Sequence, residues 1–423
     1  MLKLSQPQIV KGEAQATYQV DVASEKENRT LWYRLHESNI DLISDSSDAA
    51  LVALLIPAMA TGEDIHISGR VSEKPLYSCS EPLQAVLKSV IPSLKKIKIH
   101  AETIDDRPAE RASGVATGFS AGVDSYCVLA DHYDSKVADG FKVTHLLFNN
   151  VGSHGKGGEN LFKERYERLL PTAKLLKLPL VMVDSNLDEF YFSKRKEIRS
   201  PETGGIFEQT HTLRNASVAL FLQGGIGRYL YASAYEYKDI FVGPTGSMAY
   251  SDAVTLPLLS TETLDTLSVG SQYNRVQKTL RVAEVPTSYK TLDVCASDSK
   301  ATTAPNCSKC GKCLRTLVTL EIAGRLEQYS ESFDLSVYRT HRERYMAELL
   351  GSRKLLSREV AQFAKARGYR FPLLSYLVKA LRISGLYATA KLSQRAILSL
   401  KQLRNSLSWT SPSLQKQKPY ASS

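Results

Sequence analysis

Four of the chain's six cysteines lie within nineteen residues, and this cluster constrains the fold more than any other feature of the sequence. Cys307, Cys310 and Cys313 are separated by two residues each, and Cys295 precedes them. Zinc takes four thiolates in a tetrahedron at about 2.3 Å, and such short spacings let neighbouring thiolates reach one ion. The cluster therefore predicts a structural zinc site. An iron–sulfur cluster is the alternative. A disulfide is disfavoured because the first residues lack the apolar core of a secretory signal.

A second motif lies well upstream, in the run GVATGFSAGVDSYCVLADHY. Val115 to Phe119 predict a short buried strand, the small residues that follow predict a turn, and a helix is expected from Asp124 onward. Backbone N–H groups of such a turn approach a phosphate closely, and the helix start adds partial positive charge. We expect Ser120 and Ser125 to donate hydrogen bonds to phosphate oxygens, and Asp124 to cap the helix or reach Mg²⁺. No lysine follows the turn, so this is not a Walker-type loop. An ordinary strand–turn–helix corner is the alternative.

Three polar residues further along are candidates for a substrate site. Arg214 can pair with a carboxylate or a phosphate through two hydrogen bonds, and an internal salt bridge is the alternative. His211 and Asn215 lie beside it in the sequence. His211 either lines a pocket or is a packing histidine. All three precede or open an apolar run over residues 216–227 that predicts a helix.

A strand is also predicted over Ile240–Val242, and it runs into a glycine-containing loop. We expect Gly243 in this loop to lie near the phosphate-binding turn, because loops at the carboxyl ends of parallel strands share one edge of the sheet. Asp252 closes the loop, where it would bind Mg²⁺ or a polar substrate group, or cap the loop.

Strand-like and helix-like stretches alternate from residue 113 to about residue 324, which predicts an α/β fold with a parallel, doubly wound sheet. Residues 1–108 alternate in a β-like way and predict an N-terminal α+β domain. Residues 109–330 form the predicted catalytic domain with the cysteine cluster, residues 331–410 a basic helical extension, and residues 411–423 a disordered tail. The predicted strands are Val115–Phe119, Thr144–Phe148, Pro179–Val183 and Ile240–Val242, and the predicted helices are Ser125–His132, Glu159–Leu176 and Ala216–Gly227.

The net charge of +10 is concentrated at the C-terminal end. Residues 352–423 hold fourteen lysines or arginines and one acidic residue, so the remainder sums to about −3. This region would suit an anionic membrane surface or RNA phosphates, or present a solvated basic face on helices packed against the enzyme. The longest apolar run, near residues 49–60, is too short to span a bilayer. We expect a cytoplasmic protein whose membrane contact, if any, is peripheral.

The turn SAGVDS resembles the SGGxDS loop of the PP-loop ATP pyrophosphatase superfamily. The chain departs from that pattern at Ala121, where glycine is usual and where alanine pays for a positive φ. The resemblance implies cleavage of ATP between its α- and β-phosphates and adenylation of a substrate oxygen. The residues it assigns to ATP are Phe119, Ser120, Ala121, Gly122, Val123, Asp124 and Ser125.

The order of loop, Arg-Asn, glycine loop and four cysteines looks like that of the 7-cyano-7-deazaguanine synthases of queuosine synthesis, over residues 113–324. Two departures point to another substrate: the spacing from Cys295 to Cys307 is longer, and TLPLLSTETLD replaces the YPDCR-like stretch. The resemblance implies an ATP-dependent ligase that uses Mg²⁺, holds structural Zn²⁺, adenylates a carboxylate or carbonyl and transfers ammonia to it. Asp124 and Arg214 would be the catalytic residues, with Arg214 holding the acceptor.

Two other functions remain open from the sequence. Sulfur-transferring relatives share the loop, so a tRNA-thiolating or RNA-modifying enzyme is the first alternative, and the basic C-terminal region would then hold RNA. A degenerate nucleotide-binding or membrane-associated partner protein is the second, suggested by Ala121 and the basic C-terminal region. A homodimer is compatible with each of these.

Overall fold

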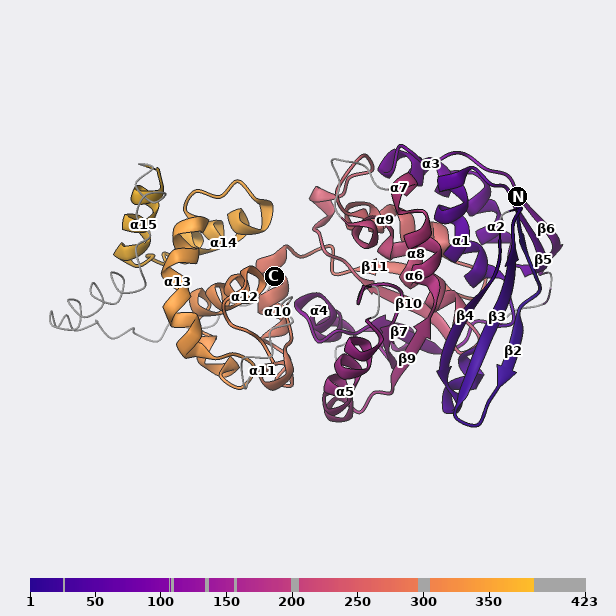
Figure 1. Cartoon of the computed structure of the whole chain (residues 1–423). Helices are drawn as coiled ribbons and strands as arrows, with labels where there is room; N and C mark the ends of the chain where they lie inside the picture. The colour runs from indigo at the N-terminus through magenta and orange to yellow at the C-terminus, as the bar shows by residue number, and fades with distance from the viewer. Residues whose placement is uncertain are drawn as a thin grey trace.

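The computed structural model describes residues 1–383 except 26, 106, 108–109, 134–136, 156–157, 199–204 and 296–304. Within these residues, eleven strands form one mixed, mostly parallel sheet. Their order is β11-β10-β7-β8-β9-β4-β3-β1-β5-β6, with β2 paired to β3. Helices cover both faces of the sheet, and further helices extend the molecule on one side (Figure 1). The predicted α/β class is confirmed at this level.

Five parallel strands form the half of the sheet that carries the predicted loop. They are β7 (Gly114–Gly118), β8 (His145–Asn149), β9 (Leu180–Ser185), β10 (Ile226–Ala232) and β11 (Asp265–Val269). Their pairings with one another are all parallel, so their carboxyl ends lie at one edge. The strands predicted to start near residues 115, 144 and 179 are confirmed as β7, β8 and β9.

The strand predicted over Ile240–Val242 is wrong, because these residues follow the short helix η3 (Tyr237–Asp239) and form no strand. The strand that pairs with β7 on this side is β10, whose first two residues lie in the stretch predicted to be helical. The helix there is α8 (Ile206–Phe221), which ends before Gly224 and Gly225. A side chain at either glycine would collide with the backbone or side chain of residues 42–43. This close approach and the lack of a helix-favouring side chain turn the chain from α8 into β10.

Residues 1–108 extend the same sheet. They supply β1 (Leu2–Leu4), β2 (Gln8–Lys11), β3 (Gln15–Ala23), β4 (Asn28–His36), β5 (Ile65–Val71) and β6 (Ile99–Ile104), with helices α1 (Asp48–Thr61), α2 (Glu73–Ser80) and α3 (Pro82–Val90). β4 pairs antiparallel with β9, with Tyr33 opposite Ser185. The sheet therefore runs without interruption across the predicted boundary at residue 108.

Alternate residues of the strands enter two separate cores. Ala116 of β7 packs with α1 and α8 on one face. Val115 packs on the other face with α4 (Val123–His132), α5 (Glu159–Leu176) and α12 (Gly311–Ile322). This alternation follows from the two-residue period of a strand. The predicted helices at 125–132 and 159–176 are confirmed as α4 and α5.

The remaining helices connect these layers and build the C-terminal part. They are α6 (Leu187–Ser193), α7 (Arg195–Ile198), α9 (Asp252–Thr255), α10 (Arg275–Val282), α11 (Ser288–Thr291), α13 (Leu335–Leu349), α14 (Leu355–Ala366), α15 (Leu373–Ile383), and the short η1 (Glu37–Leu42), η2 (Asp139–Phe141), η4 (Met248–Ser251), η5 (Leu256–Leu259) and η6 (Leu326–Tyr329). α12 to α15 lie together beyond α10 (Figure 1).

The helical character predicted for residues 331–410 is present as far as residue 383. The rest of that region, with Lys391, Arg395, Lys401 and Arg404, lies outside the described residues, as does the predicted tail 411–423. Among the described helices, none has the length and apolar character needed to cross a membrane.

Candidate functional site: a cationic cleft beside four cysteines

The loop after β7 forms one wall of a cleft of about 840 Å³. The loop residues that line it are Ser120, Ala121, Gly122, Val123 and Asp124. Gly122 is the N-cap of α4, so the start of this helix lies at the cleft. Five of the residues predicted to contact ATP are therefore brought to one surface.

Three other predicted ATP contacts do not line the cleft. The ring of Phe119 packs edge-on against Tyr126 in the core. Ser125 is buried, and its hydroxyl donates to the carbonyl of Gly122 at 3.1 Å, inside its own turn. Gly243 belongs to the segment where the expected strand is missing, and it is not among the residues that line the cleft. The hydroxyl of Ser125 thus supports the loop and does not face the cleft.

Ala121 adopts a left-handed backbone conformation with φ of 56°. This is the position at which the related loop pattern has glycine. An alanine there costs about 1–2 kcal/mol relative to the right-handed region. The carbonyl oxygen of Ala121 accepts a hydrogen bond from the amide of Asp293 at 2.8 Å. The loop thus keeps the glycine-like turn with an alanine, and a neighbouring segment helps to hold it.

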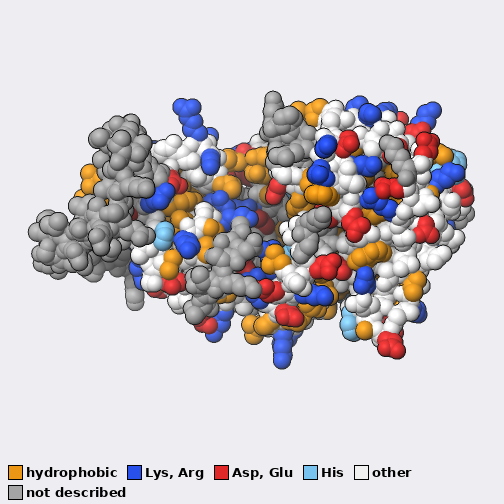
Figure 2. All heavy atoms as spheres, viewed as in Figure 1, with side chains coloured by type: hydrophobic (Ala, Val, Ile, Leu, Met, Phe, Trp, Pro, Cys, Tyr) orange, Lys and Arg blue, Asp and Glu red, His pale blue; other side chains and the backbone are white. Residues whose placement is uncertain are grey.

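Positive side chains dominate the walls of the cleft. Six cations line it, Arg165, Arg168, Arg275, Lys290, Lys312 and Arg315, against three carboxylates, Asp124, Glu164 and Asp293. Figure 2 shows blue side chains gathered where the C-terminal helices meet the rest of the molecule. A concave surface with this excess of cations attracts polyanions. Its charge contrasts with the acidic sum of residues 1–351 as a whole.

Asp124 faces the cations of α10. Its Oδ1 lies 2.8 Å from Nη1 of Arg275 and 3.5 Å from Nζ of Lys278. Burial lowers the pKa of Lys278, and Asp124 partly restores it. The lysine also donates to the hydroxyl of Ser233, just beyond β10, at 2.9 Å. Asp124 therefore pairs with cations and does not cap α4, which has no side-chain cap.

Two guanidinium groups in the cleft keep unused donors. Nε of Arg275 and Nε of Arg315 are buried and have no hydrogen-bond partner. Burial lowers the pKa of Arg315, and the charge of Arg275 lowers it further. Two like charges held close together with unused donors are stabilised by an anion between them. Both residues line the same cleft as the loop.

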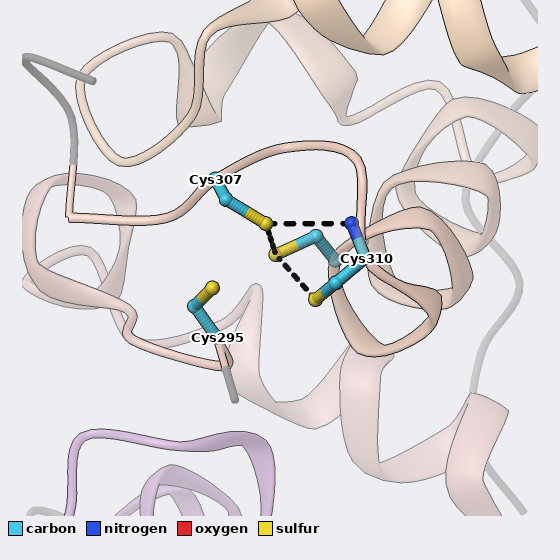
Figure 3. A group of neighbouring side chains, drawn as sticks. Cys295, Cys307 and Cys310 are labelled. Carbon is cyan, nitrogen blue, oxygen red and sulfur yellow. Dashed lines mark hydrogen bonds between the residues drawn. The ribbon is translucent and has the colours of Figure 1, made fainter. Parts of the chain in front are cut away.

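The four cysteines form a second wall of this cleft, through Cys295 and Cys307. All four sulfur atoms lie within 4.8 Å of one another, and their side chains point toward a common centre (Figure 3). Sγ of Cys313 lies 3.9 Å from Sγ of Cys307 and 3.4 Å from Sγ of Cys310. Ligands of a tetrahedral zinc ion would be about 3.8 Å apart, whereas a disulfide requires about 2.05 Å. The arrangement can hold a metal ion such as zinc.

The cluster of four cysteines has further features of a metal site. The amide of Cys310 donates to Sγ of Cys307 at 3.3 Å, a contact that would stabilise a thiolate. Burial raises the pKa of Cys313, and the neighbouring thiol of Cys310 raises it further. A bound cation would reverse this effect and stabilise the thiolates. Ser308, which follows Cys307, has φ of 56°, and this turn lets Cys310 face Cys307.

Arg214 lies on the other face of the sheet and is fully buried. Its Nη1 donates to Asp188 at 2.7 Å and to the carbonyl of Val151 at 2.8 Å, and its Nε donates to Thr210 at 2.8 Å. The guanidinium carbon lies 3.9 Å from the ring centroid of Tyr191. The internal salt bridge considered from the sequence is what the structure contains. The predicted role of Arg214 as a contact for a substrate in the cleft is not supported by this geometry.

Asp252 is buried on the same side of the sheet, whereas His211 and Asn215 of α8 are partly buried. Nδ1 of His211 contacts the hydroxyl of Tyr231 at 2.7 Å, and burial lowers the histidine pKa to about 4. Asp252 accepts a hydrogen bond from Thr212 at 2.6 Å, and burial raises its pKa to about 7. Asn215 accepts from Asn149, at the carboxyl end of β8, at 3.1 Å. These residues are brought together with one another and not with the loop at Ser120.

Sequence reasoning missed the cations that complete the cleft. Arg275 and Lys278 lie in a polar stretch, and Arg315 follows the last cysteine, and neither segment was assigned to the site from the sequence. Their helix periodicity carries a signal: α10 has the strongest segregation of polar and apolar residues among these helices, yet Lys278 falls on its buried side. A buried lysine on an amphipathic helix indicates a nearby carboxylate or ligand.

Comparison with known proteins adds no relative: no family model, curated protein or solved structure matches this chain.

Proposed function

We propose that the chain is an ATP-dependent enzyme that binds the phosphates of ATP in the cationic cleft and adenylates an acceptor oxygen. The proposal rests on one observation. The loop Ser120–Asp124 lines the same cleft as Arg275 and Arg315, whose Nε donors have no hydrogen-bond partner. Backbone amides at the start of α4 and the two guanidinium groups would share the negative charge of a polyphosphate. The resemblance of SAGVDS to a pyrophosphate-binding loop supports the same assignment.

The chemistry would follow from where charge builds up. An oxygen of the acceptor, a carboxylate or a carbonyl, attacks the α-phosphate, and pyrophosphate leaves. Arg275, Arg315 and Lys312 would stabilise the charge on the leaving group. Such electrostatic stabilisation usually makes the largest contribution to the rate enhancement. Ammonia then displaces AMP from the adenylated acceptor. Because Arg214 is buried on the other face, the acceptor would be held by residues of the cleft instead.

Mg²⁺ and Zn²⁺ would have different places in this scheme. Asp124 supplies the carboxylate closest to the loop, and Mg²⁺ bound to phosphates commonly needs one or two carboxylates. To bind Mg²⁺, Asp124 would give up part of its contact with Arg275 and Lys278. Four thiolates fill the coordination of zinc, so a zinc ion would be structural.

The experiment is a pyrophosphate-exchange and AMP-release assay on the full chain with ATP, Mg²⁺, ammonium and a pool of small organic acids. Arg315→Gln should lower exchange at least tenfold, because a charged hydrogen bond to phosphate is lost. Arg339→Gln is the matched control, since Arg339 is exposed on α13 and pairs with Glu327. Absence of ATP binding in the intact, metal-loaded protein would rule the proposal out. ATP binding without turnover would favour the degenerate nucleotide-binding alternative.

A sulfur-transferring enzyme is the second candidate, and one observation favours it. Cys295 and Cys307 line the same cleft as the loop, so a metal centre there would be close to a bound nucleotide. Cysteines outside the cluster are poor sulfur carriers: burial raises the pKa of Cys127 to about 12 and also raises that of Cys79. The reactive centre would therefore be an iron–sulfur cluster. Metal analysis decides, because a colourless protein with one zinc per chain excludes this candidate.

A further inference from the structure

A short segment before the first cysteine ties the loop to the cluster. The amide of Asp293 donates to the carbonyl of Ala121, the residue with the left-handed conformation. Two residues later comes Cys295, whose amide donates to the carboxylate of Asp293 at 3.3 Å. Figure 3 shows the ribbon of the loop region, in purple, passing close to Cys295. The loop and the cysteine cluster, far apart in the sequence, are thus joined through one backbone hydrogen bond.

Asn306 holds the other end of this segment. It is fully buried, and it immediately precedes Cys307. Its Nδ2 donates to the carbonyl of Leu292 at 2.6 Å, and its Oδ1 accepts from the amide of Val294 at 2.8 Å. Asp293 lies between these two contacts. The position of the Asp293 amide is therefore set by a side chain adjacent to a metal ligand.

Two further contacts fix the segment against the wall of the cleft. The hydroxyl groups of Thr291 and Tyr126 are hydrogen bonded to each other, and Tyr126 is part of α4. The carboxylate of Asp293 lies 3.7 Å from Nη1 of Arg168 on α5. We name residues 291–295 the strap. The strap contacts the loop, the helix after the loop and the cluster, and it also lines the cleft.

We infer that metal binding at the four cysteines sets the shape of the loop through the strap, with Asn306 as the positioning residue. A bound metal fixes Cys295 and Cys307, which hold the two ends of the clamp around Asp293. The amide of Asp293 then stays in place to hold the carbonyl of Ala121, and the left-handed turn is kept although alanine resists it. Without metal the strap is released, and the loop relaxes toward a shape that presents fewer amides to an anion.

The first test measures the loop directly and needs no nucleotide. Hydrogen exchange of the amides in residues 118–126 is compared in metal-loaded full-length protein and in protein stripped with a chelator. We expect faster exchange in the loop and strap of the stripped protein, with β9 and β4 unchanged. Equal protection of the loop in both forms, with metal loss verified by elemental analysis, would overturn the inference.

The second test leaves the metal in place. Asp293→Pro removes the amide donor, and it is compatible with the extended backbone of Leu292 before it (φ −60°, ψ 120°). Asp293→Ala is the matched control, because it loses the same carboxylate and keeps the amide. We expect both variants to keep their metal. Only the proline variant should lose protection of the loop amides against hydrogen exchange. Equal loop protection in both variants would contradict the inference. Should the proline variant not fold, Asn306→Ala replaces it, with metal content measured alongside loop exchange.

The consequence for ligand binding rests on the proposed function. Pyrophosphate and ATP are titrated by calorimetry into the metal-loaded wild type, Asp293→Ala and Asp293→Pro. We expect the affinity of Asp293→Pro to be about tenfold below that of Asp293→Ala, which lacks the same cleft carboxylate, because about one hydrogen bond is lost. If the metal-loaded wild type binds neither ligand, the proposed function fails while the exchange data still decide the inference. If the wild type binds and Asp293→Pro binds as tightly as Asp293→Ala, the inference fails while the proposed function stands.

Discussion

Arginine side chains have different surroundings on the two faces of the parallel sheet. On the α8 face, Arg214 is enclosed by Asp188, Thr210 and the ring of Tyr191, with no access to solvent. On the α4 face, Arg275 and Arg315 line an open cleft and keep unused donors. The sequence predicted one site that combined the loop at Ser120 with Arg214, and it did not predict Arg275 or Arg315. The structure separates an enclosed interior, in which Nη2 of Arg214 also lacks a hydrogen-bond partner, from a cleft lined by six cations and three carboxylates.

This difference shows which observations indicate a ligand. A buried arginine with a carboxylate, a carbonyl and an aromatic ring around it is explained by the protein itself. Arg275 and Arg315 instead line a cleft with six cations and three carboxylates, and their Nε donors could bind an added anion although Arg275 also pairs with Asp124. Residue type alone does not distinguish the two cases. The comparison therefore predicts that mutations on the α8 face change stability, and mutations in the cleft change binding.

The largest effect is expected for Arg214→Ala. Removing the guanidinium leaves Asp188 without its buried partner and opens a cavity beside Tyr191. We expect a loss of about 3–5 kcal/mol in the free energy of unfolding. Denaturant unfolding measures it, with Arg339→Ala as the exposed control, which should change stability by less than about 1 kcal/mol. A stable Arg214→Ala protein that has lost ATP turnover would instead place the α8 face in the active site.

The next effect concerns the buried carboxyl of Asp252, whose pKa is raised to about 7 by burial. The folded state binds this proton more tightly than the unfolded state, so stability falls as pH rises from about 4 to about 7 and then levels off. Between pH 5 and pH 8 this group alone should cost about 2–3 kcal/mol. Asp252→Asn keeps an oxygen for Thr212 and removes the titration.

Unfolding of wild type and Asp252→Asn at pH 5, 6.5 and 8 measures this contribution. The gap in stability between the variant and the wild type should grow in favour of asparagine as pH rises. If the difference in free energy of unfolding between the two proteins does not change with pH, Asp252 does not titrate in this range. Its surroundings would then be more polar than its burial indicates.

Local patterns predicted the parts of the fold that depend on neighbours in sequence. The strand, turn and helix around Ser120 and the cysteine spacing were read correctly because each is completed within about twenty residues. Helix α5 was predicted at its observed ends for the same reason. The cleft could not be predicted in full, because α5, α10, α11 and α12 supply its cations from distant parts of the chain. Only tertiary packing brings Arg165, Arg275 and Arg315 to one loop.

The error at Ile240–Val242 has a physical cause. Three apolar residues before a glycine look like the end of a strand, and the helix predicted over Ala216–Gly227 ran through the Gly224–Gly225 pair. The pair of glycines instead allows the close approach of residues 42–43, and β10 begins directly after them. Arg214 and Gly243 are not among the residues that line the cleft beside the loop.

A smaller effect, opposite in sign to an ordinary loss of function, is expected for Asp124→Asn. Neutralising this carboxylate releases Arg275 and Lys278 from their ion pairs. Affinity for pyrophosphate without Mg²⁺ should rise about three- to fivefold, since a partly exposed ion pair contributes about 1 kcal/mol at most. Affinity for ATP with Mg²⁺ should not gain, because the carboxylate nearest the loop is gone. Calorimetry at fixed ionic strength gives both values, and Glu284→Gln, outside the cleft, is the control. A fall in pyrophosphate affinity would mean that the anion binds elsewhere.

The smallest effect is expected for Ala121→Gly. With φ of 56°, alanine is strained at this position, and glycine removes the strain while making the unfolded chain more flexible. The net gain in stability should be about 0.5–1 kcal/mol. Ala130→Gly, in the interior of α4, is the matched control and should lose about 1 kcal/mol, because its backbone is helical. If the loop is already held by the strap, ATP turnover of Ala121→Gly should equal that of the wild type. A large gain in turnover would instead show that the natural alanine impairs the loop, and would move the chain toward the degenerate, nucleotide-binding alternative.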